Sequence, residues 1–149
     1  MSDDCVKNSV CVYRTGPLYD FLIDLENRGA VFTGSRAFGL HKGNADWDYF
    51  MLKSAYDQLG LPVYETSSSY ADSEFKHIRF HLFCNGHDKE IDLLLMLPEV
   101  YACWYWANIC FFKLLELPGF KRRMQNKSAR VKWFEFFKEN RRNADTVSD

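Results

Sequence analysis

Three aspartates and a Gly-Ser pair are the residues of this chain whose types and spacing could support a reaction. Asp46 and Asp48 stand two apart in the segment ADWDYFML, whose alternation followed by a wholly apolar stretch predicts a strand. Side chains at positions i and i+2 of a strand point to the same face, so the two carboxylates would lie side by side, with Trp47 on the opposite face. Because adjacent carboxylates repel each other, we expect a divalent cation that prefers oxygen ligands, Mg²⁺ or Mn²⁺, between them.

A third carboxylate, Asp92, lies inside the apolar segment EIDLLLML. An aspartate in so apolar a strand is costly unless a partner compensates its charge. Three acids on neighbouring strands can hold two metal ions, the arrangement that stabilises the attacking and leaving oxygens of an in-line phosphoryl displacement. Caps and turns alone would explain the other motifs, but they explain Asp92 poorly.

Gly34 and Ser35 follow a short apolar strand over residues 30–33 and precede a short helix predicted over residues 36–40. We expect Ser35 to cap that helix, so that backbone N–H groups and the positive helix end face a phosphate. Glycine would allow the phosphate to approach the main chain closely. A phosphate cradle and a carboxylate cluster belong to the same chemistry, which is nucleotidyl transfer.

The three motifs together resemble the signature of the DNA polymerase β-like nucleotidyltransferase superfamily. That signature is Gly followed by Gly or Ser, then Asp-x-Asp or Asp-x-Glu with an apolar x, then an Asp between apolar residues on an adjacent strand. Here Gly34-Ser35, ten further residues, Asp46-Trp-Asp48 and Ile91-Asp-Leu93 stand in that order. Over residues 33–49 the chain is also similar to the GSRA-aromatic-G form of a bacterial and phage branch linked to RNA repair. Thr33 departs from the pattern, which usually has an apolar residue before the glycine.

The resemblance implies a role for each matching residue. Asp46, Asp48 and Asp92 would ligate the metal ions, and Asp92 would also help to deprotonate the acceptor hydroxyl. The main chain at Gly34 and the side chain of Ser35 would hold the β- and γ-phosphates of an NTP. Further candidate contacts to phosphate, nucleotide or acceptor are Arg36, Lys42, Lys76, His77 and Arg79.

The elements that must position these residues are predicted to form one α+β (α/β) domain over residues 1–149. Periodicity and turn residues predict, in chain order, a helix that ends near residue 29, strands over 30–33 and 46–52, a helix over 54–59, a hairpin of strands over 76–84 and 90–97, and helices over 98–117 and about 120–142. We therefore expect a small mixed β-sheet with flanking helices. By the resemblance, residues of about 15–97 form the polymerase β-like core and those of about 98–142 add C-terminal helices, while a surface loop over 65–74 would shape the acceptor side.

The charge of the chain is distributed unevenly. Residues 1–120 carry 10 Lys and Arg against 16 Asp and Glu, a charge of −6, and residues 121–149 carry 9 against 4, a charge of +5. Arg122, Arg123 and Arg130 belong to the basic final segment and are candidate contacts to the phosphates of a nucleic acid. A solvated basic helix face explains the same residues equally well.

Other residue groups point to more ordinary roles. The five cysteines form no CxxC pair, and no signal-like or membrane-spanning apolar stretch is present, so free thiols, no membrane segment and a cytoplasmic location are expected. A zinc site built from His77, His81, Cys84 and His87 is not favoured, because the predicted strand puts His77 and His81 far apart and turns Cys84 away. The aromatic residues of the last two helices are expected to form core.

The sequence thus predicts a Mg²⁺-dependent nucleotidyltransferase that moves an NMP from an NTP to an acceptor hydroxyl and releases pyrophosphate. An RNA end, for example that of a tRNA, is the leading acceptor, on the basis of the GSRAFG resemblance and the basic final helix. Two alternatives stay open. The acceptor could be a protein or a small molecule, or the chain could be a catalytically silent member that binds a nucleotide or a partner protein.

Overall fold

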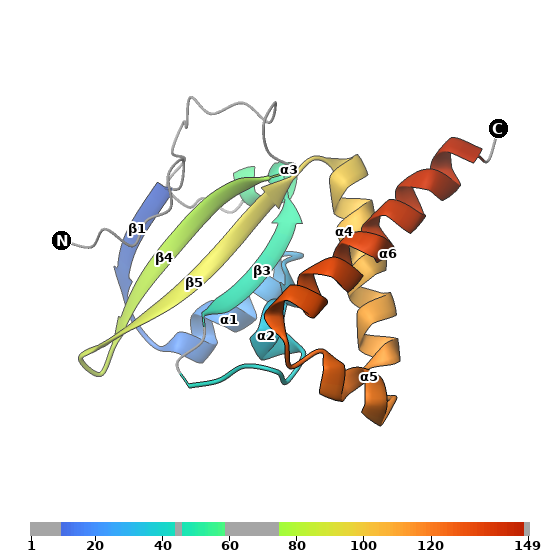
Figure 1. The fold of residues 1–149 in the computed structure, drawn as a ribbon. Helices are drawn as coiled ribbons and strands as arrows, with labels where there is room; N and C mark the ends of the chain where they lie inside the picture. The colour runs from blue at the N-terminus through green and yellow to red at the C-terminus, as the bar shows by residue number, and fades with distance from the viewer. Residues whose placement is uncertain (1–9, 44–45, 59–74, 148–149) are drawn as a thin grey trace.

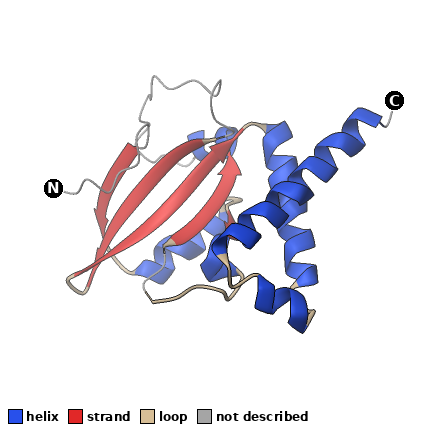
Figure 2. Cartoon of the chain, in the orientation of Figure 1, coloured by secondary structure: helices blue, strands red, loops and turns tan. Residues whose placement is uncertain are grey.

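The computed structural model describes residues 10–43, 46–58 and 75–147. They form a mixed α+β fold, in which the described strands make one five-stranded sheet that is covered by helices (Figure 1). Figure 2 shows the strands in a single layer, with helices behind it and at one side of it. The predicted α+β class with a small mixed sheet and flanking helices is confirmed. The surface loop predicted over residues 65–74 lies outside the described residues.

The sheet brings together strands that are far apart in the sequence. The strands are β1 (Val10–Thr15), β2 (Val31–Thr33), β3 (Trp47–Leu52), β4 (Lys76–Cys84) and β5 (His87–Met96), in the order β1-β4-β5-β3-β2. Pairing is parallel between β1 and β4 and between β3 and β5, and antiparallel in the other two pairs. The predicted β4–β5 hairpin is confirmed, and its turn is tighter than expected, with positive φ at both Asn85 and Gly86.

The two faces of the sheet differ in chemistry because alternate residues of a strand point to opposite faces. One face is apolar and packs on α1 (Leu18–Asn27); its buried residues are Tyr49, Met51, Ile78, Phe80, Leu82, Ile91, Leu93 and Leu95. The other face carries Asp48, His77, Arg79, His81, Glu90 and Asp92 at the intervening positions. We call these the apolar face and the charged face.

The helices after the sheet form a second core. α4 (Pro98–Leu114), α5 (Pro118–Arg123) and α6 (Lys127–Val147) pack with the short α2 (Gly34–Ala37), while α3 (Lys53–Asp57) follows β3. The core residues are Phe38, Leu40, Ala107, Phe111, Phe120, Met124 and Phe137. Because the Phe38 ring lies 4.5 Å from the Phe111 ring, the segment that begins at Gly34 is held against α4.

The structure corrects the prediction for the last helix. A single helix was expected from about residue 120 to 142, but α5 ends at Arg123 and α6 begins at Lys127. Asn126 lies at the break, where its side chain accepts a hydrogen bond from the backbone N–H of Ala129 (3.1 Å), as an N-capping residue does. The preceding helix is also shorter than expected, since α4 ends at Leu114.

Two further differences concern the N-terminal half. β1 was not predicted, because it pairs with β4 more than sixty positions along the chain and its own sequence, VCVYRT, is short. Ser35 was expected to cap a helix, but α2 begins at Gly34 with Thr33 as its N-cap residue and no side-chain cap bond. α2 is therefore one turn long, and it offers main-chain N–H groups without a sizeable helix dipole.

Two findings concern the state of the cysteines and the hydropathy of the helices in the described part of the chain. Cys84, Cys103 and Cys110 are free thiols. Among the helices of the described ranges, none has the length and hydropathy that crossing a membrane requires.

Candidate functional site

Gly34 and Asp48 are in direct contact, which explains why a glycine stands in the first motif. β2 pairs with β3 so that Thr33 lies opposite Asp48, and Gly34 follows with φ of +82°. A Cβ atom at Gly34 would lie 2.3 Å from Asp48 Oδ2. A larger residue would therefore be strained by its backbone conformation and would also collide with the carboxylate.

Thr33, the departure from the family pattern, has a partner of its own. Its buried hydroxyl donates a hydrogen bond of 2.7 Å to Asn108 Oδ1 on α4. The Asn108 side-chain amide in turn donates to the carbonyl of Phe32 (3.3 Å). These bonds fix the end of β2, and with it Gly34, against α4.

The three predicted aspartates meet on the charged face. Asp48 lies opposite Asp92 in the parallel β3–β5 pair, and Asp46 directly precedes β3. Asp46 and Asp48 line one cavity, while Trp47 packs into the core of the opposite face, 5.6 Å from the Phe32 ring. The predicted arrangement of this motif, with both carboxylates on one side and Trp47 on the other, is confirmed.

Arg79 lies among these acids and connects two of them. It stands opposite Asp92 in the β4–β5 pair, and its Nε and Nη2 atoms donate to the two Asp92 oxygens at 2.8 and 3.2 Å. Nη2 also lies 3.4 Å from Asp46 Oδ2. On the same strand, His77 Nε2 lies 2.8 Å from Asp92 Oδ1. The guanidinium thus supplies positive charge to a site that we expected a metal ion to neutralise.

The three carboxyl groups of the site differ in pKa. Burial and the neighbouring Asp92 charge raise the pKa of Asp46 from its ordinary value of 3.8 to about 7 and that of Asp48 to about 8. Burial also raises the pKa of Asp92, but hydrogen bonds from His77 and Arg79 outweigh it and hold this pKa well below its ordinary value. Arg79 therefore keeps Asp92 ionised, whereas Asp46 and Asp48 would need a further cation to be ionised near neutral pH.

The donor set fits a hard divalent cation. Three carboxylates on adjacent backbone positions supply the oxygen ligands that Mg²⁺ and Mn²⁺ prefer. Such a cation would lower the raised pKa values of Asp46 and Asp48, and it would compete with Arg79 for Asp92. In the described part of the chain, the group of three ligand atoms that lies within 4.8 Å consists of His81, Asp88 and Glu90 rather than of the three aspartates.

A cavity of about 590 Å³ opens beside the aspartates, within the size range of small-molecule sites. Its lining includes Gly34, Ser35, Asp46 and Asp48. Phe75, Leu94, Trp104 and Phe134 also line it, and α6 contributes Lys127, Arg130, Val131, Glu135 and Lys138. Basic side chains of α6 and the two carboxylates therefore line the same cavity.

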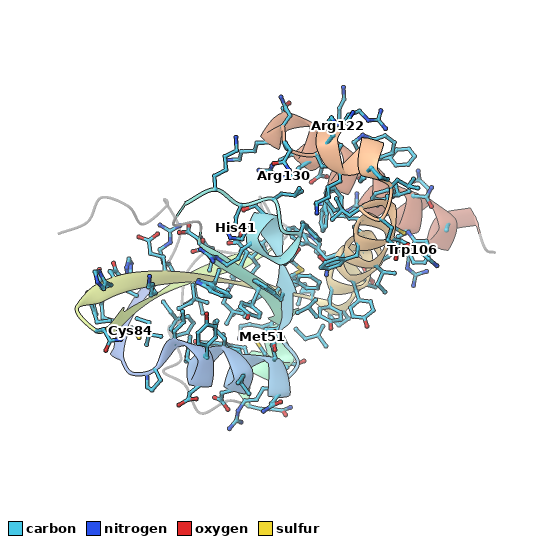
Figure 3. All side chains as sticks on the ribbon, turned by 90° about the horizontal axis from the view of Figure 1, so that it is seen from below. His41, Met51, Cys84, Trp106, Arg122 and Arg130 are labelled. Atoms are coloured by element: carbon cyan, nitrogen blue, oxygen red, sulfur yellow. The ribbon has the colours of Figure 1, made fainter. Side chains whose placement is uncertain are left out.

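The predicted basic contacts lie in different places. Arg130 lines the cavity, and its Nη1 atom donates to the carbonyls of Met124 (2.9 Å) and Gln125 (3.2 Å) at the end of α5. Arg122 and Arg123 are exposed on α5 and are not among the cavity-lining residues. Figure 3 shows Arg122 at the outer edge of the molecule and Arg130 closer to the segment that carries His41. The structure therefore brings one of the three arginines to the aspartates.

The three other predicted phosphate contacts, Arg36, Lys42 and Lys76, do not line this cavity. The Arg36 guanidinium lies 4.4 Å from the centre of the Trp47 ring, Lys42 is exposed, and Lys76 begins β4. All three remain predictions. Sequence reasoning named Arg130 as a candidate nucleic-acid contact but missed that α6 lines this cavity: Lys127, Arg130, Phe134 and Lys138 follow helical spacing, which could have indicated one common face.

The histidines do not gather as the zinc hypothesis required. His77 bonds to Asp92, whereas the buried His81 bonds to Asp88 through Nδ1 (3.1 Å) and stacks on the Tyr13 ring at 4.7 Å. Glu90 completes the group that includes His81 and Asp88, on the charged face near the hairpin. His77 and His81 thus pair with two different carboxylates.

Comparisons of the chain with family models, with curated proteins and with solved structures found no match. The assignment of a function therefore rests on the residues named above, their spacing in the sequence and their geometry.

Proposed function

We propose that this chain is a Mg²⁺-dependent nucleotidyltransferase that moves an NMP from an NTP to an acceptor hydroxyl. In this reaction the acceptor hydroxyl gives up its proton, with the help of Asp92, and its oxygen forms a bond to the α-phosphorus. The bond from that phosphorus to the bridging oxygen of the β-phosphate breaks, and pyrophosphate leaves. The observation that carries the proposal is that Asp48 pairs with Asp92 in the sheet and, together with Gly34, lines a cavity of nucleotide size. It joins the three motifs of the sequence in one place.

The residues have distinct tasks in this proposal. Asp46, Asp48 and Asp92 hold Mg²⁺, which when bound supplies charge neutralisation at the attacking and leaving oxygens. Main-chain N–H groups at Gly34 and the Ser35 hydroxyl bind the β- and γ-phosphates. Because little covalent chemistry is required of the protein in phosphoryl-type transfer, positioning and electrostatics account for most of the rate.

The basic residues of the cavity support the same proposal. Lys127 and Arg130 line the same cavity as Asp46 and Asp48, and such basic side chains can bind phosphate oxygens. An RNA end is the acceptor that we favour, because Arg122 and Arg123 extend a basic surface outward along α5. A protein or small-molecule hydroxyl is the alternative acceptor.

A catalytically silent, nucleotide-binding protein is the second candidate function, and Arg79 favours it. Its guanidinium forms ion pairs with Asp92 (2.8 Å) and Asp46 (3.4 Å) and so partly replaces a metal ion. In an active enzyme Mg²⁺ must compete with these bonds. A silent member would retain them and would bind its nucleotide without turnover.

The test is incubation with each α-labelled NTP, Mg²⁺ and either total RNA or total protein, followed by measurement of the label in each fraction. We expect label in RNA, dependence on Mg²⁺, and loss of the label with Asp48→Asn. Asp24→Asn is the matched control, because Asp24 is an exposed aspartate paired with Arg28 on α1. Nucleotide binding without transfer to any fraction would support the silent candidate instead.

A further inference from the structure

An ion pair between a buried lysine, Lys138, and an exposed glutamate, Glu135, lies in the part of the cavity that the proposed reaction does not use. Lys138 is only 1% exposed, and its Nζ atom lies 2.6 Å from Glu135 Oε1. Nζ also lies 4.6 Å from the centre of the Trp104 ring. Both members of the pair line the cavity. Burying an ammonium group is costly unless several partners compensate it, so a lysine at this position calls for an explanation.

The ion pair lies away from the phosphate-binding end. The Trp104 ring packs 5.7 Å from the ring of Phe50, which stands two residues beyond Asp48 on β3. Two residues of strand advance the chain by about 7 Å. On α6, Lys138 is three turns beyond Lys127, about 16 Å along the axis. The cavity therefore has a carboxylate end and an aromatic end.

The aromatic end has the features of a site for a flat, polar ring. Phe75, Trp104 and Phe134 supply ring surface, with Trp104 5.7 Å from Phe75 and 5.1 Å from Phe134. Nucleobases pack well against such surfaces. Beside these rings, the ammonium of Lys138 can donate hydrogen bonds and the carboxylate of Glu135 can accept two.

We propose that the aromatic end binds the base of the NTP and that Glu135 and Lys138 select guanine; this inference rests on the nucleotidyltransferase function proposed above. Guanine presents O6 as an acceptor for the ammonium, and its N1–H and N2–H groups can both donate to one carboxylate. Adenine and cytosine each present a single amino group beside an acceptor, and uracil presents a single ring N–H, so each leaves part of the pair unsatisfied. GTP is therefore the preferred donor nucleotide.

Equilibrium binding tests the proposal without turnover. The probes are GTP, ATP, CTP, UTP and inorganic tripolyphosphate, each titrated calorimetrically in Ca²⁺ against the full chain. We expect GTP to bind at least tenfold more tightly than the other three. Glu135→Gln and Lys138→Met should each reduce this preference about tenfold or more, because hydrogen bonds to charged groups are lost. Their affinity for tripolyphosphate should not change.

Two further variants serve as controls. Glu139→Gln removes an exposed carboxylate that pairs with Arg142 one turn further along α6, and it should leave the preference for GTP unchanged. Lys138→Arg retains the charge and should retain part of the preference even if Lys138→Met folds poorly.

The outcomes separate the two proposals. If tripolyphosphate and all four NTPs bind equally, if another base is preferred, or if both variants keep the wild-type preference, the assignment of Glu135 and Lys138 is overturned and the transferase function stands. If neither tripolyphosphate nor any NTP binds, the proposed function fails and this inference fails with it.

Discussion

The apolar and the charged face of the sheet are both built from β3, β4 and β5, yet their side chains are stabilised in different ways. On the apolar face, Phe80 and Leu93 are fully buried against α1 and need no partner beyond close packing. On the charged face, the intervening positions of the same strands carry ionisable residues along part of their length, and Asp48 and Asp92 lie directly opposite each other. Neighbouring carboxylates on a half-buried sheet face lower the stability of the fold, and departures of this kind from good packing are expected at functional sites. The comparison therefore assigns stability to the apolar face and function to the charged face.

The largest effect on stability is expected on the apolar face. Phe80→Ala should lower the free energy of unfolding by about 3–5 kcal/mol, because a fully buried ring is lost and a cavity remains. Phe136→Ala, at a ring that is 55% exposed on α6, should cost less than about 1 kcal/mol. Urea denaturation measures both. Similar losses for the two variants would contradict the assignment of stability to the apolar face.

The contact between Gly34 and Asp48 predicts the next largest effect. Gly34→Ala should destabilise the fold by about 1–3 kcal/mol more than Gly39→Ala, since both glycines have positive φ but a Cβ atom collides with Asp48 only at Gly34. The comparison cancels the backbone strain that the two variants share. Equal losses of stability would show that Asp48 moves aside at no cost.

The raised pKa values predict an unusual pH dependence on the charged face. Because the folded-state pKa values of Asp46 and Asp48 (about 7 and about 8) exceed the ordinary 3.8, their contribution to stability is complete below about pH 4 and is lost as the pH rises through 7 and 8. Without divalent ions, the Tm should fall by several degrees between pH 5 and pH 9.

Two changes should reduce that fall. Asp48→Asn removes one titrating group and the repulsion with Asp92, so its Tm at pH 8 should equal or exceed that of the wild type. Mg²⁺ should raise the wild-type Tm at pH 8, because it binds the ionised carboxylates. A Tm for Asp48→Asn far below the wild-type value would assign Asp48 a structural role.

The smallest effect concerns the basic surface outside the cavity. Arg122→Glu with Arg123→Glu should raise the KM for RNA and reduce the slope of log affinity against log salt by about 1.5–2 units. Arg130 is left unchanged here, because it bonds to carbonyls at the end of α5 and its loss would disturb the helix junction. Arg28→Glu, at an exposed arginine on the opposite half of the chain, should have no such effect. An unchanged slope in the double variant would favour a protein or small-molecule acceptor.

The sequence predicted those parts of the site that depend on local pattern. Asp46 and Asp48 share a face because they stand two apart in one segment, and Asp92 was recognised because it interrupts an apolar segment. Arg79 was named only as a possible contact, because its bond to Asp92 depends on the register between β4 and β5, which no local pattern specifies. β1 was missed for the same reason.

The cavity wall on α6 was missed for a different reason. Lys138 belongs to the basic final helix, for which a solvated face was one expectation. The break at Asn126 and the packing of α6 on α4 instead bury this side chain. When helix packing brings side chains together, the sequence shows at most their helical spacing. A role for such side chains can be inferred only when the residues that line the rest of the cavity are also known.

We propose that the aspartates of the charged face bind the divalent ion, and titration of Mn²⁺ in the presence of an NTP is the sharpest test of this site. Electron paramagnetic resonance measures the bound ion in the wild type, in Asp48→Asn and in Asp88→Asn, which alters the separate group of His81, Asp88 and Glu90. We expect Asp48→Asn to lose the bound Mn²⁺ and Asp88→Asn to retain it. Retention of Mn²⁺ in Asp48→Asn together with its loss in Asp88→Asn would refute the aspartate site, because it would place the metal near the hairpin and leave the aspartates beside Gly34 without one.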